Sequence, residues 1–118
     1  MPRPSKSNPA LEASIALARE LFAGLGDIQV RKMFGGAGVY YSGRMFALIA
    51  DTEIYLKADR HNQADFDAHD CPYFHYDKGS GEVMTMSYRA MPLIGLDDPE
   101  EALHWARRGI AAAQRAKP

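Results

Sequence analysis

Cysteine is almost absent from the sequence. Cys71 is the only one among 118 residues. A single cysteine excludes an intramolecular disulfide and any metal site built from several cysteines. So low a cysteine content is also typical of proteins that work in a reducing cytosol.

Long apolar runs are absent as well. The longest run, from Met45 to Ala50, has the length of a strand, whereas a transmembrane helix needs about 20 apolar residues. The first nine residues, Met-Pro-Arg-Pro-Ser-Lys-Ser-Asn-Pro, contain no apolar region like that of a signal peptide. We therefore expect a soluble, cytoplasmic protein that does not bind membranes.

An excess of either charge is missing too. Lys and Arg number 14 and Asp and Glu number 15, so the strongly basic composition of many nucleic-acid-binding domains is not found. A chain of 118 residues has room for one domain of ordinary size. The prolines and small polar residues at the start predict a flexible lead over residues 1–8, followed by a single domain over residues 9–118.

The most informative stretch runs from Arg31 to Asp51. It reads as a strand, a glycine-rich bend, a second strand, a tight turn at Ser42-Gly43 and a third strand. The third strand, Arg44 to Ala50, has two apolar faces, which strict alternation divides into Met45, Ala47, Ile49 and Phe46, Leu48, Ala50. Such a strand is usually covered on both sides. We expect helices on one side and more of the chain or a second subunit on the other.

Helical and strand patterns surround this stretch. Apolar residues at steps of three and four predict a first helix over residues 9–23 and a last helix from Pro99, with Asn8 and Asp98 as N-caps. The remaining expected elements are strands over 28–34, 35–41, 53–57, 74–76 and 83–88, a short helix over 60–68 and a hairpin loop over 77–81. The order α-β-β-β(-β)-α-β-β-α predicts an α+β fold of two layers, in which helices pack on a mainly antiparallel sheet.

Five blocks of this sequence resemble the N-terminal domain of the TfoX/Sxy family. They follow one another in the family's order and span nearly the whole chain. The blocks are Arg31 to Tyr40, Gly43 to Asp51, Tyr55 to Asp59, Met86 to Tyr88 and Ala102 to Ala106.

The resemblance implies a fold similar to that of type III secretion chaperones, which are often dimeric. Its named members regulate bacterial natural competence and act as co-activators with the cAMP receptor protein. Those regulators carry a second, C-terminal domain, which we expect this chain to lack, and no catalytic residues are known in the family. The resemblance therefore implies a non-enzymatic regulatory or adaptor domain, a homodimer without cofactors, with the cAMP receptor protein or RNA polymerase as partner. The alternative is a homodimeric small-molecule-binding module with its pocket between the glycine-rich strands and the last helix.

The glycine-rich bend is the first candidate site. Its backbone N–H groups could form a nest for an anion, or the loop could contact a partner. It lacks the Gly-Lys-Ser/Thr ending of a phosphate loop, which favours a plain bend in the sheet. The candidate loop residues are Met33, Phe34, Gly35, Gly36 and Arg44.

Basic residues near the C-terminus are the second candidate. Arg107, Arg108 and Arg115 could touch nucleic-acid phosphates, together with Arg31, Lys32 and Arg44. Basic residues in this part of a helix also complement its dipole. The balanced composition favours that second role, so we do not expect direct nucleic-acid binding.

Two further groups of residues are candidate sites. An acidic and histidine-containing cluster matches no standard metal spacing, and no nucleophile motif accompanies the four histidines, so neither a metal nor an enzyme is expected. The cluster consists of Asp65, Asp67, His69, Asp70, Cys71 and His75.

A stripe of apolar and aromatic side chains could be core or part of a dimer interface. It consists of Met45 or Phe46 with Met84, Met86 and Tyr88.

Overall fold

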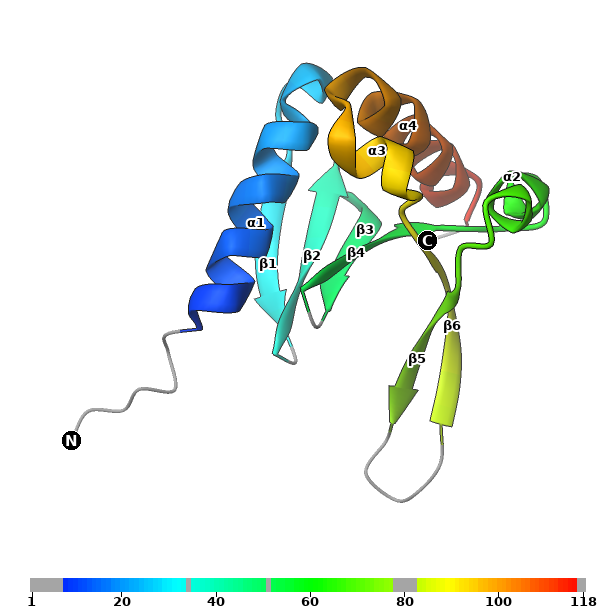
Figure 1. Ribbon diagram of the computed structural model, residues 1–118, viewed down its shortest axis with the longest axis horizontal. Helices are drawn as coiled ribbons and strands as arrows, with labels where there is room; N and C mark the ends of the chain where they lie inside the picture. Colours follow the sequence, from blue (N-terminus) through cyan, green and yellow to red (C-terminus); the bar gives the residue numbers. More distant parts are fainter. Residues whose placement is uncertain (1–7, 34, 51, 78–82, 117–118) are drawn as a thin grey trace.

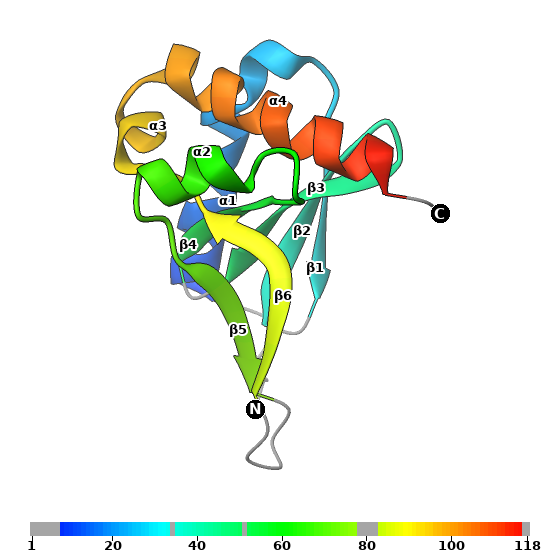
Figure 2. The same ribbon diagram turned by 90° about the vertical axis from the view of Figure 1, so that its right-hand side faces the viewer.

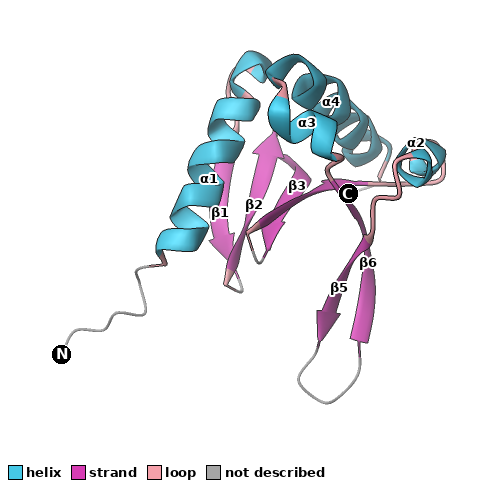
Figure 3. Cartoon of the chain, in the orientation of Figure 1, coloured by secondary structure: helices cyan, strands magenta, loops and turns pink. Residues whose placement is uncertain are grey.

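The chain folds into two layers, a bent antiparallel sheet and a group of helices packed on one side of it (Figures 1 and 3). The computed structural model describes residues 8–33, 35–50, 52–77 and 83–116. The expected lead, apart from residue 8, and residues 78–81 of the expected hairpin loop lie outside the described residues. The α+β class predicted from the element order is confirmed.

Six described strands form one sheet in the order β1-β2-β3-β4-β6-β5, with every neighbouring pair antiparallel. The strands are β1 (Gln29–Met33), β2 (Gly36–Tyr41), β3 (Arg44–Ala50), β4 (Glu53–Lys57), β5 (Tyr73–Asp77) and β6 (Val83–Ala90). The helices are α1 (Pro9–Leu21), α2 (Gln63–Ala68), α3 (Leu93–Asp97) and α4 (Pro99–Arg115), with a 3₁₀ turn, η2 (Ala23–Leu25), after α1.

Local signals set the starts of the two long helices. The Asn8 side chain accepts a hydrogen bond from the Leu11 N–H at 3.2 Å, and the Asp98 side chain accepts one from the Glu100 N–H at 2.9 Å. A proline follows each cap. Both predicted N-caps are therefore confirmed, because each depends only on residues within one helical turn.

Helix α4 lies directly on β3 and β4, and Gly109 makes this approach close. A Cβ atom added at Gly109 would lie 2.8 Å from the Phe46 carbonyl oxygen, which is a backbone atom. The helix therefore sits nearer to the sheet than a larger side chain at this position would allow. Ala102, Trp105, Ala106, Ala112 and Ala113 complete its buried side.

A β-bulge in β3 moves Phe46 into the core. Tyr40 of β2 pairs with Met45, and the next pair along β3 is made by Ala47, so Phe46 is an extra residue between them. Its ring meets that of Phe22 edge-on, with centroids 5.4 Å apart, and both rings are fully buried. The expected strict alternation, which placed Phe46 on the opposite face from Ala47, is therefore wrong, because the bulge breaks the period of two.

Two helical segments differ from the sequence expectation. The short helix begins at Gln63 rather than Arg60, because the Asp59 side chain accepts hydrogen bonds from the N–H groups of His61 and Asn62 and holds them in a turn. Helix α3 was not predicted, since its five residues are too few to show a helical period.

Candidate functional site

One face of the sheet carries no helix among the described residues, and we call it the uncovered face. Helices α1 and α4 pack on the other face, where Ile49, Ile54 and Leu56 point (Figures 1 and 2). Strand registers place alternate residues on the uncovered side. Its side chains include Gln29, Arg31, Met33, Tyr40, Met45, Leu48, Ala50, Glu53, Tyr55, Lys57, Phe74 and Tyr88.

Two cations on this face lie over tyrosine rings. The Arg31 Cζ is 5.0 Å from the Tyr40 ring centre, and the Lys57 Nζ is 5.1 Å from the Tyr88 ring centre. Neither cation forms an ion pair within the described part of the chain. Burial raises the pKa of Tyr88 to about 12, and the neighbouring Tyr40 acts in the same direction. The two pairs therefore belong to one surface, which presents positive charge beside aromatic rings.

The rest of the uncovered face is mainly apolar, apart from the exposed Gln29 and Glu53. Met33 and Met45 lie over Gly38, since a Cβ atom added there would be 2.9 Å from the Met33 Cε and 2.6 Å from the Met45 Sδ. The Tyr55 and Phe74 rings meet edge-on with centroids 5.1 Å apart. Methionine and aromatic side chains adapt well to an apolar partner surface.

A pocket of about 500 Å³ opens where this face meets the C-terminal end of α4. It is lined by Ser42, Arg44, Met45, Lys57 and Tyr88, together with the last turn of the helix. The Arg44 Nη1 donates to the carbonyl oxygens of Ala113 at 3.4 Å and Ala116 at 3.1 Å. Arg44 thereby caps the helix and complements the negative end of its dipole.

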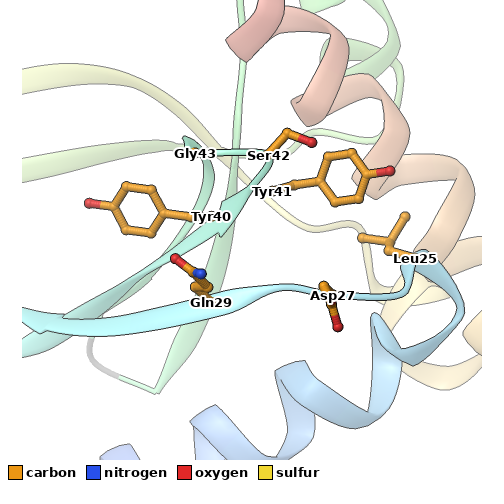
Figure 4. A pocket seen from close by; sticks show the side chains of 7 residues that line it. All are labelled: Leu25, Asp27, Gln29, Tyr40, Tyr41, Ser42 and Gly43. Atoms are coloured by element: carbon orange, nitrogen blue, oxygen red, sulfur yellow. The ribbon is translucent and has the colours of Figure 1, made fainter.

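A second hollow of about 290 Å³ lies beside the same Ser42-Gly43 turn, where β1 begins and β2 ends (Figure 4). Tyr40 and Tyr41 line it from opposite sides of β2, and Gln29 lies below Tyr40. Asp27, the one charged residue that lines it, points away from both rings. The polar groups do not converge, so this hollow offers no site for a reaction or for an ion.

The candidate loop residues do not form one group. Gly36 lies against the end of β3 that contains Ile49, whereas Arg44 begins the same strand at its other end. A Cβ atom added at Gly36 would lie 2.2 Å from the Ile49 carbonyl oxygen, so this glycine allows the strands to pack. Gly35 has a positive φ of 78°, Met33 lies on the uncovered face, and Phe34 is outside the described residues.

Two of the three basic residues of α4, Arg108 and Arg115, are engaged within the protein. The two oxygens of Asp59 accept hydrogen bonds from Arg115 at 2.7 and 2.9 Å, and this lowers the pKa of the Asp59 carboxyl. Arg108 pairs with Asp65 at 3.0 Å and stacks 4.3 Å from the centre of the Trp105 ring.

The other members of the expected basic patch are dispersed. Lys32 pairs with Glu12 of α1, and Arg107 is exposed on α4. Arg31 and Arg44 lie on the sheet, at the two places already described. The structure therefore does not gather these side chains into one patch.

The acidic and histidine-containing cluster is likewise spread out. Asp67 pairs with the buried Arg89 at 2.6 Å, and the His69 ring packs edge-on against Trp105. Cys71 is buried, which raises the pKa of its thiol, and its backbone oxygen accepts a hydrogen bond from the Arg89 Nε at 2.8 Å. Within the described ranges, no three His, Cys, Asp or Glu residues are grouped to hold a metal ion.

Sequence reasoning missed several residues of the uncovered face, among them Tyr40, Tyr55, Lys57 and Phe74. The sequence signal for these residues was the third strand, which has apolar side chains on both faces. A strand that is apolar on the face away from the helices predicts apolar side chains on the same face of the adjoining strands. The pairing of β4 with β6, which brings Lys57 beside Tyr88, could not be read from local patterns.

A comparison with protein families gives a match over most of the chain. None of the described helices has the length and apolar character needed to cross a membrane. Among curated proteins, no match to the sequence is found. The TfoX N-terminal domain matches residues 20–113, which include the whole sheet as well as α2, α3 and most of α4. The chain therefore belongs to the TfoX N-terminal domain family.

Proposed function

We propose that this protein is a competence-regulator-like adaptor domain that acts through protein contacts on its uncovered face and catalyses no reaction. The observation that carries this proposal is a sheet face with partly exposed methionine, tyrosine and phenylalanine side chains, such as Met33, Tyr40 and Phe74. The same face also carries two cations without an ion pair in the described part of the chain. Aromatic residues, methionine and arginine are enriched at protein interfaces.

The charge of the face favours a partner with acidic side chains. Arg31 and Lys57 would attract carboxylates of a different protein, while Glu53 of β4 adds one carboxylate to the same face. The cAMP receptor protein and RNA polymerase are the partners expected from the family. A homodimer through the same face is the competing arrangement.

Co-purification tests the contact surface. Tagged protein would be recovered from lysate of its own organism, and bound cAMP receptor protein and RNA polymerase would be quantified against a tag-only control. Arg31→Glu reverses a charge on the exposed β1, and Arg19→Glu makes the same change on an exposed position of α1. We expect Arg31→Glu to reduce recovery of one of these partners about tenfold or more, and Arg19→Glu to leave it unchanged.

Equal recovery with both variants would contradict a contact on the uncovered face. Light scattering at micromolar concentration tests the competing arrangement, because a dimer that Arg31→Glu dissociates would place a second copy there. Thermal melting of each variant would show that the fold is retained.

A further inference from the structure

The pocket at the C-terminal end of α4 presents hydrogen-bond donors, two of them positively charged. Lys57, Arg44, Tyr88 and Ser42 all line it, and no Asp or Glu is among the described residues that line it. Its volume of about 500 Å³ lies within the range typical of small-molecule sites. The pocket is open to solvent, and positive charge without a carboxylate among its described lining residues favours an anionic ligand.

The positive groups in this pocket are not neutralised by ion pairs. Arg44 uses its Nη1 to cap the helix, and its other guanidinium nitrogens have no hydrogen-bond partner among the residues described. Lys57 contacts the face of the Tyr88 ring and, in the same part of the chain, no carboxylate. A planar guanidinium and an ammonium group with free donors are the usual partners of carboxylate and phosphate oxygens.

Tyr88 adds a neutral donor to the same wall. Its side chain is only 5% exposed, and its hydroxyl has no hydrogen-bond partner within the described ranges. The hydroxyl is not among the described buried polar atoms that lack a partner, so it reaches the surface of the pocket and can donate to a ligand oxygen. Burial raises the pKa of Tyr88 to about 12, so the hydroxyl remains a neutral donor even in mildly alkaline solution.

We propose that this pocket binds a small organic anion, whose carboxylate or phosphate group is held by Lys57, Arg44 and Tyr88. Met45 and Ala113 provide an apolar wall for the body of the ligand. The site would make the domain responsive to a metabolite, at a place that adjoins the uncovered face. It does not depend on the identity of the protein partner.

Backbone amide NMR with defined probes tests this site. The probes are phenyl phosphate, phenylacetate, the neutral phenylacetamide and inorganic phosphate. We expect one of the two aromatic anions to shift the amides of Ser42, Lys57 and Tyr88 with a saturable midpoint below about 1 mM, and phenylacetamide to leave them unshifted. The two aromatic anions distinguish a phosphate group from a carboxylate group.

Variants separate this site from a general attraction of anions. Lys57→Met and Tyr88→Phe should each weaken binding about tenfold or more, whereas Lys32→Met removes a charge on β1 that is paired with Glu12 and should have no effect. Arg31→Glu, the variant for the protein contact, should retain the anion site, so failure of one proposal can be told from failure of the other.

Two results would overturn the proposal. One is the absence of saturable shifts with both aromatic anions in a folded protein. The other is binding that Lys57→Met and Tyr88→Phe leave unchanged, or that inorganic phosphate reproduces with equal affinity, because either would indicate a general surface attraction.

Discussion

Gly36 is the residue at which the sheet tolerates least change. Its missing Cβ would lie 2.2 Å from a backbone oxygen of β3, which no side-chain rotation can relieve. We expect Gly36→Val to lower the free energy of unfolding by at least about 2 kcal/mol. Urea denaturation measures this change.

A matched control for Gly36 is Gly24→Ala. The added methyl group there meets only the end of the Leu103 side chain, which can move. A Gly36→Val protein that unfolds at the wild-type urea concentration but loses partner binding would contradict a structural role and make the bend a contact site.

Asp59 should make the stability depend on pH through its pair with Arg115. Hydrogen bonds from Arg115 lower the pKa of Asp59 from its ordinary value of 3.8. The folded state therefore favours the carboxylate, so its contribution is present above pH 3.8 and is lost as the pH falls through the lower folded-state value. Because both side chains are partly exposed, we expect this contribution to be below about 1 kcal/mol.

The Asp59→Asn variant tests the sign of this effect. It should be less stable than the wild type at pH 7, and the difference should shrink in strongly acidic buffer. Asp27→Asn, at an exposed position before β1, serves as the control. A stability difference that stays constant down to acidic pH would show that the carboxylate charge is not responsible.

At the scale of elements, the contact of α4 with the sheet decides the effect of Gly109→Ala. Alanine is favoured over glycine in a helix by about 1 kcal/mol, which alone predicts a gain. The added methyl group would, however, lie 2.8 Å from the Phe46 carbonyl oxygen and push the helix away from β3. We expect a net loss of about 1–2 kcal/mol in the free energy of unfolding.

Arg107→Ala is the control on the same helix, because Arg107 is exposed. It should change stability by less than about 0.5 kcal/mol. Should Gly109→Ala stabilise the protein instead, the helix would have room to shift, and the close approach would not be required.

At the scale of the whole molecule, the sheet has two parts. Helices cover one part, and the other part is the β5-β6 hairpin, which extends away from the helices. Figures 1 and 2 show β5 and the first half of β6 extending away from the helices. β5 is an edge strand, and its only described neighbour in the sheet is β6. β3, in contrast, pairs on both sides and lies under α4.

Hydrogen exchange should reveal this difference. We expect the amides of Ala47 and Ile49 in β3 to exchange about a hundredfold or more slowly than those of His75 and Tyr76 in β5, because local opening needs less free energy where few apolar contacts are lost. Equal protection of the two strands would contradict this and indicate that a partner or second copy covers the hairpin.

The sequence by itself determined the features that depend on near neighbours. Asn8 and Asp98 cap their helices, the turn lies at Ser42-Gly43, and the element order specifies the α+β class, since each of these needs only a few consecutive residues. The two-faced third strand also indicated that a face would need cover beyond the helices.

Only the tertiary structure decided what lies on that face. Three features join residues from different elements. They are the bulge at Phe46, the ion pairs of Arg108 and Arg115, and the pocket in which Lys57, Tyr88 and Arg44 meet. Their positions depend on the pairing of β4 with β6 and on the docking of α4, both of which bring together segments far apart in the chain. A periodic pattern predicts which face a residue occupies, but not which distant residue it meets there.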